Sequence, residues 1–181
     1  RQKGQQNFIR AASLIAGQHP RASFFMIGRQ CDSFNADLMR WVEQAGLRGR
    51  IHLLAERHDV VDCMSAFDVF CLPSLLEGFP NALGEAMAAG RACVATSTGG
   101  SAELLAGHGL LVAADDSRAL ADAMARLVGL SYEERETMGR AARRHIIETY
   151  DLDKVLKQYD DLYASLAGIA PRPTSLTYGQ E

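Results

Sequence analysis

The sequence has no apolar run of about 18 residues, no C-x-x-C cysteine pair and no large cluster of lysine and arginine. The first absence argues against a membrane-spanning helix, and the second against a zinc site built on paired cysteines. The one basic cluster, residues 140–145, is surrounded by glutamates. We interpret it as a solvated helix face rather than a nucleic-acid surface.

Other common signatures are also missing. No G-x-G-x-x-G follows a strand-like run, which argues against a dehydrogenase, and no signal-peptide pattern opens the sequence. Four cysteines are present, and two of them, Cys71 and Cys93, fall inside apolar runs. We predict that these two are buried as small hydrophobic residues and that the protein works in a reducing, cytoplasmic setting.

What the sequence does contain is an alternation of strand-like and helical segments. Its 181 residues are 48% hydrophobic, which suits one domain with a substantial core. The strand-like runs are apolar throughout, as in strands that are buried on both faces. They cover residues 22–27, 51–54, 68–72, 92–96 and 110–112. With helical patterns between them, they predict an α/β fold with a Rossmann-like, doubly wound parallel sheet.

The C-terminal part has a different organisation. Residues 131–149 and 152–167 have the pattern of two consecutive helices with no strand between them. Ser131 and Glu134 have the spacing of a capping box, and Asp151 is predicted to cap the last helix.

The domain boundary is predicted at the end of the last helix. Residues 1–167 are expected to form one Rossmann-like domain, and residues 168–181, which have no periodic pattern, an extended or mobile tail. The first helix begins within a few residues of Arg1, whereas a doubly wound sheet normally begins with a strand. We therefore expect that a first strand is missing and that the chain is a fragment of a longer protein.

The stretch LLEGFPNALGEAMAAG, residues 75–90, places two carboxylates around a helix start. It directly follows a predicted strand, and ligands of open α/β sheets bind beyond the carboxyl ends of the strands. If Asn81 caps the helix, the first helical amides form a ready site for phosphate, and Glu85 lies one residue too late for a capping box. A nucleotide-sugar would match this arrangement, because its phosphates are flanked by hydroxyl groups that can donate hydrogen bonds to Glu77 and Glu85.

A plainer interpretation of the same residues is equally open from spacing alone. Glu77 and Glu85 can be surface charges near a helix N-terminus, each contributing about 0.3–1 kcal/mol. Lys3 can be a surface lysine, and Arg57 either stacks on a base or lies in a polar loop. The Asp-Leu-Asp sequence at 151–153 matches a metal-binding D-x-D, but its place at a helix start favours capping.

The order of motifs over roughly residues 3–165 resembles that of the group 1, family 4-like glycosyltransferases. These are retaining, nucleotide-sugar-dependent enzymes with the two-domain GT-B fold, and the resemblance is to their C-terminal, donor-binding domain. The matching segments are Lys3-Gly4, Ile27-Gly28, residues 57–60, residues 68–74, Glu77 to Asn81, Glu85 to Gly90, residues 95–100 with Glu103, and residues 109–112.

The resemblance implies roles for particular residues. Glu77 would contact the transferred sugar, and Glu85 the ribose of the nucleotide. Lys3, with an arginine that would precede Arg1, would neutralise the leaving diphosphate. The implied catalytic residues are Glu77 and Lys3, and the implied donor-binding residues are Gly28, Arg57, Gly78, Phe79, Asn81, Ala82, Leu83 and Glu85. Because Pro80 has no N–H, the amides of the three residues that follow it must supply the contacts.

The implied reaction transfers a sugar from a UDP- or GDP-type donor to an acceptor with retention. No metal or other cofactor is expected, because a helix N-terminus and Lys3 can absorb the charge that builds on the diphosphate. The acceptor site is expected in a missing N-terminal domain, toward which the helix 152–167 would cross back, so this fragment alone should be inactive. Polysaccharide biosynthesis is a common use of the family, and association with the inner face of a membrane would involve only absent parts.

Two alternatives stay open. A sugar-nucleotide epimerase or a phosphorylase of related fold would also keep a diphosphate site, but the sequence has no motif for the additional acid–base or cofactor chemistry. A non-catalytic nucleotide-binding module is the other alternative. It would bind nucleotide regardless of the sugar and would tolerate the loss of Glu77.

Overall fold

The computed structural model describes residues 2–168 of the chain. Five strands are present in this part, β1 (Phe24–Met26), β2 (Ile51–Leu53), β3 (Val69–Leu72), β4 (Ala92–Thr96) and β5 (Leu110–Val112). The helices are α1 (Gln5–Ala16), α2 (Ala36–Gln44), α3 (Val60–Ser65), α4 (Asn81–Ala88), α5 (Ser101–Leu105), α6 (Ser117–Gly129), α7 (Tyr132–Tyr150) and α8 (Leu152–Ala167). The tail predicted for residues 168–181 lies, apart from Gly168, outside the described residues.

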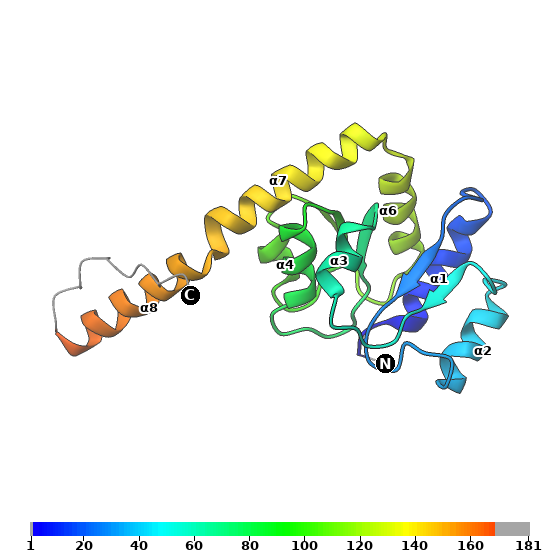
Figure 1. Ribbon diagram of the computed structural model, residues 1–181, viewed down its shortest axis with the longest axis horizontal. Helices are drawn as coiled ribbons and strands as arrows, with labels where there is room; N and C mark the ends of the chain where they lie inside the picture. The colour runs from blue at the N-terminus through cyan, green and yellow to red at the C-terminus, as the bar shows by residue number, and fades with distance from the viewer. Residues whose placement is uncertain (1, 169–181) are drawn as a thin grey trace.

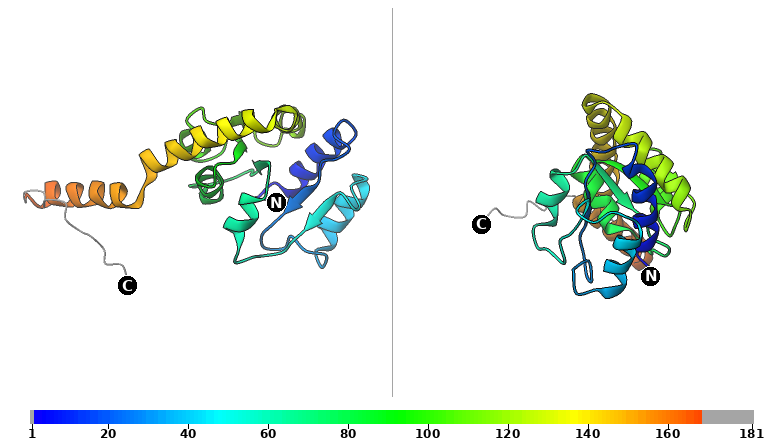
Figure 2. Two further views of the ribbon diagram at one scale, coloured as in Figure 1. Left: turned by 45° about the horizontal axis from the view of Figure 1, so that its top comes forward. Right: turned by 90° about the vertical axis from the view of Figure 1, so that its right-hand side faces the viewer.

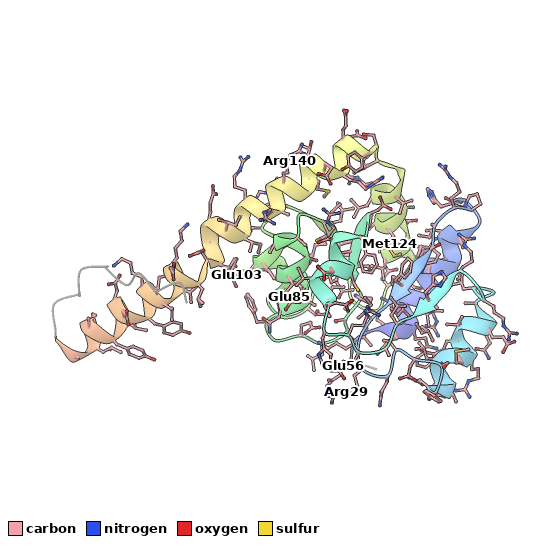
Figure 3. All side chains as sticks on the ribbon, viewed as in Figure 1. Arg29, Glu56, Glu85, Glu103, Met124 and Arg140 are labelled. Atoms are coloured by element: carbon pink, nitrogen blue, oxygen red, sulfur yellow. The ribbon has the colours of Figure 1, made fainter. Side chains whose placement is uncertain are left out.

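Strand β4 shows how the layers are arranged. All of its residues are buried, as the predicted parallel sheet requires. Ala92 and Val94 pack into a core with α1, α2 and α6, which includes Met124 (Figures 1 and 3). Cys93 and Ala95 pack into a second core with α3, α4, α5 and α7. Because successive side chains of a strand point to opposite faces, helices cover both faces of the sheet, and the predicted Rossmann-like fold is confirmed.

The strands are all parallel, but they pair in two groups. Strand β1 pairs with β2, and β3, β4 and β5 pair in that order. No strand pairing joins β1 to β3 within the described residues, so the predicted sheet is divided between them. The last two predicted strands have the predicted bounds, whereas the first three are shorter than their apolar runs.

The burial of the two cysteines differs between the central strand β4 and the edge strand β3. Cys93, in the central strand, is fully buried as predicted, and burial raises the pKa of its thiol to about 12. Cys71, in β3, is only partly buried, because β3 has a neighbouring strand on one side alone.

The two C-terminal helices occur as predicted. The side chain of Ser131 accepts from the Glu134 amide while the Glu134 carboxylate accepts from the Ser131 amide, which confirms the capping box. Asp151 caps α8 by accepting from the Asp153 amide at 3.1 Å, so the capping interpretation of this Asp-Leu-Asp sequence is confirmed. Helices α3 and α5 were not predicted, because they are too short for a periodic pattern.

Helix α7 lies across α4 and β4, while α8 extends away from the body (Figures 1 and 2). Gly139 of α7 allows the close approach, since a Cβ there would overlap the carbonyl of Gly90. No residue of α8 is buried, and its leucines and tyrosines are exposed. Among residues 2–168, no helix combines the length and apolar character that crossing a membrane requires.

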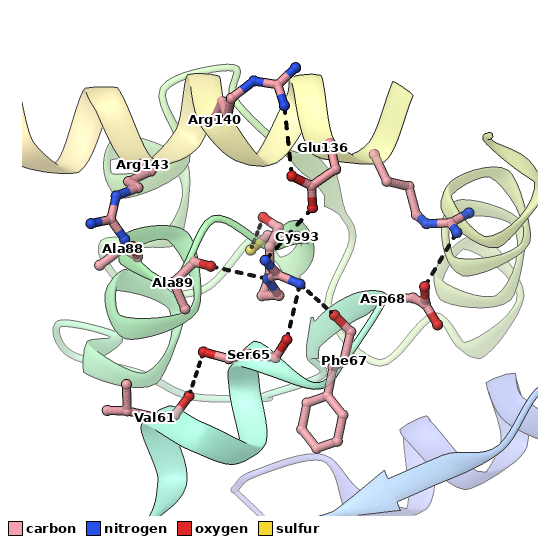
Figure 4. Close-up of polar contacts among 12 residues, drawn as sticks. Val61, Ser65, Phe67, Asp68, Ala88, Ala89, Cys93, Glu136, Arg140 and Arg143 are labelled. Atoms are coloured by element: carbon pink, nitrogen blue, oxygen red, sulfur yellow. Dashed lines mark hydrogen bonds and ion pairs between the residues drawn. The ribbon is translucent and has the colours of Figure 1, made fainter. Parts of the chain in front are cut away.

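Arg91 joins several elements at the amino ends of β3 and β4, and its partners Ser65, Phe67 and Glu136 are labelled in Figure 4. Its Nη1 atom donates to the carbonyls of Ser65 and Phe67 at 3.3 and 3.1 Å, and its Nη2 atom lies 3.8 Å from a carboxylate oxygen of Glu136 in α7. These contacts hold the segment before β3 and helix α7 together at the amino end of the sheet.

Candidate functional site

The loops that follow β1, β2 and β3 surround a hollow of about 610 Å³ at the carboxyl end of the strands. The start of α1 and the start of α4 complete its wall. Seven of the ten predicted site residues line it, namely Lys3, Gly28, Arg57, Glu77, Phe79, Asn81 and Ala82, whereas Gly78, Leu83 and Glu85 do not. The structure therefore brings together residues that are as many as 79 positions apart in the sequence.

Glu77 is the most tightly held polar side chain of this hollow. Only 7% of its side chain is exposed, and Lys3 Nζ lies 2.7 and 3.0 Å from its two carboxylate oxygens. The hydroxyl of Ser74, which is fully buried, donates to the same carboxylate at 2.6 Å. A buried charge is tolerated when it is paired and hydrogen-bonded in this way. Glu77 is thus fixed in place before any ligand enters.

The backbone around Glu77 is held by the loop that follows β4. Gly99 has φ +50°, and a Cβ there would overlap the carbonyl oxygens of Glu77 and Gly78. The Gly100 amide donates to the Gly78 carbonyl at 2.9 Å. The hydroxyl of Thr96, at the end of β4, donates to the Ser74 carbonyl at 2.5 Å. Residues 96–100 thus support the Glu77 loop from beneath, where only glycine fits at position 99.

Helix α4 begins one residue earlier than the sequence suggested. Pro80 is its N-cap and makes no side-chain capping hydrogen bond, so the predicted cap, Asn81, is the first helical residue. The amides of Asn81 and Leu83 donate to the carbonyls of Phe79 and Pro80, at 3.0 and 2.9 Å. The amide of Ala82 makes no hydrogen bond within the described residues. The positive end of the helix therefore faces the hollow, with one of its amides still unpaired.

Glu85 differs from Glu77. It is exposed on α4, one turn beyond the helix start, and it does not line the hollow (Figure 3). Within the described residues its carboxylate makes no hydrogen bond or ion pair. A contact between Glu85 and a ribose stays a prediction, as do the roles of the other site residues.

Arg57 lies at the rim, in the loop after β2. Its Nε atom donates to Asp59 at 2.7 Å, and its Nη2 atom contacts the other oxygen of the same carboxylate. This hydrogen-bonded pair raises the pKa of Arg57 and lowers the pKa of Asp59. Gly28 has φ +134° and donates its amide to the Ala55 carbonyl at 2.8 Å, which joins the loops after β1 and β2.

The charges around the hollow are mixed. Lys3, Arg29 and Arg57 supply positive charge, and Glu56 lies 4.0 Å from Arg29 at the same end of the molecule (Figure 3). No group of His, Cys, Asp and Glu with the spacing of a metal site occurs in the part of the chain that the structure describes. These cations, each of which lies near a carboxylate, and the helix start give the hollow the chemistry of an anion site beside a carboxylate.

Sequence reasoning missed two residues of this arrangement. Ser74 belongs to the Pro-Ser pair that ends the strand, and its position three residues before Glu77 was the available signal. Gly99 lies in the segment of residues 95–100, for which no role was predicted, and no local signal showed that its backbone supports that of Glu77.

Comparison with known proteins decides the family. The family model described as glycosyl transferases, group 1, matches residues 1–129, well over half of the chain. The chain belongs to the group 1 glycosyltransferases. It is 32% identical over 155 residues to the lipopolysaccharide core biosynthesis mannosyltransferase LpsB of Rhizobium meliloti, with 82% of this chain and 43% of that protein covered. The chain thus spans less than half the length of this relative.

Solved structures of glycosyltransferases share the fold. The C-terminal domain of a group 1 glycosyltransferase, LpcC, from Francisella tularensis superposes with a TM-score of 0.71 at 26% identity, over 83% of this chain and 81% of that one. Anabaena Alr3699/HepE, solved in complex with UDP, superposes with a TM-score of 0.81 at 24% identity, over 91% of this chain and 46% of that one. The Rossmann-like architecture of this chain therefore matches most of the LpcC C-terminal domain and about half of the Anabaena protein.

Proposed function

We propose that residues 1–167 form the donor-binding part of a retaining glycosyltransferase that uses a nucleotide-diphosphate sugar. The observation that carries the proposal is the Glu77 carboxylate, which is buried at the carboxyl end of the strands and held by Lys3 and Ser74. Family membership supports the reaction class, and the complex of Anabaena Alr3699/HepE with UDP supports a nucleotide as part of the ligand.

In this proposal the diphosphate lies against the start of α4, near the unpaired amide of Ala82. As the anomeric C–O bond of the donor breaks, negative charge builds on the diphosphate. The helix N-terminus and Lys3 stabilise that charge, so that no metal ion is needed. Lys3 has three N–H donors and is 63% exposed, so it can contact a phosphate oxygen while keeping one contact to Glu77.

Glu77 then has its carboxylate next to the transferred sugar, where it accepts from sugar hydroxyls. Ser74 holds one carboxylate oxygen, and the other is left for the ligand when Lys3 moves toward the diphosphate. Glu85, one helical turn further, accepts from the ribose hydroxyls, and Arg57 and Gly28 border the base. In these assignments the carboxylates accept hydrogen bonds from hydroxyl groups, and the cations pair with phosphate.

The acceptor site belongs, in this proposal, to the remaining half of the protein, and the exposed leucines and tyrosines of α8 face that half. The pathway is cell-envelope polysaccharide or lipid-linked sugar assembly on the cytoplasmic side of a membrane. The named relative in lipopolysaccharide core biosynthesis supports this setting.

Calorimetric titration with UDP, GDP and their sugars, in the presence of EDTA, tests the proposal. We expect one nucleotide to bind with no added metal. Lys3→Ala should weaken the binding of nucleoside diphosphates about tenfold (about 1.4 kcal/mol) and leave the binding of the monophosphate unchanged. Lys157→Ala, in α8 and far from the hollow, is the control and should change neither. Binding that requires a divalent metal, or that is identical in the Lys3→Ala protein, would contradict the proposal.

A further inference from the structure

A row of four ring-bearing side chains leads from the donor hollow to the segment between α5 and β5. Phe79 lines the hollow, and its ring centroid lies 5.8 Å from that of Tyr150, the last residue of α7. The ring of His145, further back in α7, lies edge-on to Tyr150 at 5.9 Å. His108 follows, with its ring centroid 5.0 Å from that of His145. The row thus joins three segments that are distant in the sequence.

Phe79 belongs to the turn that connects Glu77 to α4. Its carbonyl accepts from the Asn81 amide at 3.0 Å, so its backbone is part of the helix start. Its side chain is 56% exposed. On one side lies Gly100, where a Cβ would stand 3.6 Å from the ring. Among residues 2–168, Tyr150 supplies the one aromatic contact of this ring.

Tyr150 itself is anchored in the body of the domain. It is half-buried and packs, with Ile146, against the second core, which includes Leu83 and Met87 of α4. Burial and the charge of Glu103 raise the pKa of its hydroxyl, so Tyr150 is neutral at physiological pH. A ring that is fixed by packing on one side can restrain a more exposed ring on the other.

The ring contact restrains Phe79 where its backbone is not held. The loop after β4 contacts the backbone of Glu77 and Gly78 from beneath, but within the described residues it makes no hydrogen bond to Phe79. Tyr150 ends α7 directly before Asp151, where α8 leads away from the body (Figure 1). The side chain of Phe79 is therefore held from the end of α7.

We propose that Tyr150 is a positioning residue for the donor site. Its ring holds Phe79, and through Phe79 the turn between Glu77 and α4, in the orientation that receives the nucleotide sugar. Tyr150 does not line the hollow, so it acts through Phe79 and not by touching the ligand. Its hydroxyl makes no hydrogen bond within the described residues, so the ring alone is required. The role of the turn rests on the proposed function, whereas the contact between the two rings does not.

Backbone order parameters from ¹⁵N relaxation of the ligand-free chain test the proposal. Tyr150→Leu removes the ring, and Tyr150→Phe retains it without the hydroxyl. Tyr132→Leu makes the same change at the exposed first residue of α7 and is the control. In Tyr150→Leu we expect the order parameters of the Phe79 and Asn81 amides to fall from about 0.85 to below about 0.6. In the other two variants they should retain the parent values.

Calorimetric titration with UDP-glucose and GDP-mannose measures the effect on the donor. For the nucleotide sugar that binds the parent, we expect Tyr150→Leu to raise the Kd about tenfold and Tyr150→Phe to stay within about twofold. Each titration is carried out well below the melting temperature of the variant. A loss of stability alone therefore does not change the Kd.

Several results would overturn the proposal. Absence of a nuclear Overhauser effect between the rings of Phe79 and Tyr150 in the parent would show that they do not pack, and this measurement needs no variant. Unchanged order parameters or an unchanged Kd in Tyr150→Leu would show that other contacts hold the turn. A tenfold loss in Tyr150→Phe would assign the role to the hydroxyl. If the parent binds neither nucleotide sugar, the proposed function fails, and the order parameters alone decide this inference.

Discussion

The two glutamates on either side of the turn before α4 lie in different surroundings. Glu77 is buried and held by two side chains, whereas Glu85 is exposed and has no partner among the described residues. A carboxylate held in this way is positioned before a ligand arrives, and its partners must be rearranged when one does. A free carboxylate is positioned only by its helix. The same motif therefore contains one preorganised group and one that gains its partner from the ligand.

The largest expected effect comes from the support beneath Glu77. Gly99→Ala should lower the free energy of unfolding by about 3 kcal/mol or more, because it combines a positive φ with overlap against the Glu77 backbone. Gly107→Ala is the control, since Gly107 has φ +83° but open space around its Cβ position, and it should cost about 1–2 kcal/mol. Urea unfolding measures both. Equal costs would show that the loop after β4 does not restrain Glu77.

Removing a partner of Glu77 should have the next largest effect. Ser74→Ala leaves a buried carboxylate without one hydrogen bond and should cost about 1.5–3 kcal/mol of unfolding free energy. Ser13→Ala, which removes an exposed hydroxyl bonded to the Arg10 carbonyl, should stay within about 0.5 kcal/mol. If the two variants lose the same unfolding free energy, Ser74 does not stabilise the carboxylate.

Glu85→Gln should leave stability within about 0.5 kcal/mol of the parent, because the side chain is exposed and has no partner. If Glu85 binds ribose, the change should weaken the binding of a nucleoside diphosphate and of its sugar form by the same factor, about tenfold. Calorimetry on both ligands checks this. A loss confined to the sugar form would exchange the roles of the two glutamates.

The smallest effect concerns the capping box of α7. The Ser131 amide and hydroxyl lower the pKa of Glu134, so its contribution to stability is present above the ordinary glutamate pKa, about 4.3, and is lost as the pH falls through the lowered value. Glu134→Gln should reduce the melting temperature at pH 7. It should also make the decrease of the melting temperature between pH 7 and pH 3 smaller than in the parent. Glu133→Gln, in the same helical turn, should retain the pH dependence of the parent.

Much of the fold could be predicted from local patterns. Apolar runs located all five described strands, and the capping residues Ser131 and Asp151 fixed the starts of α7 and α8. The division of the sheet could not be predicted, because strand order depends on contacts between distant segments. The start of α4 was misplaced by one residue, since Asn81 is a common cap but follows a proline that already occupies that position.

Seven of the ten predicted site residues line one hollow, but their contacts with one another could not be predicted. Lys3 and Glu77 were each assigned a ligand, whereas the structure pairs them with each other. They are 74 positions apart, and no local pattern reports such a pair. Arg57 and Asp59 are only two positions apart, yet their pairing depends on the loop conformation.

The central claim is that Glu77 recognises the sugar of the donor. The most direct test is the ratio of the Kd of the nucleotide diphosphate to that of its sugar form, measured by calorimetry for the parent and for Glu77→Gln. We predict that Glu77→Gln lowers this ratio about tenfold or more, while the diphosphate binds at least as tightly as before, because Lys3 is released from its partner. An unchanged ratio would contradict the account.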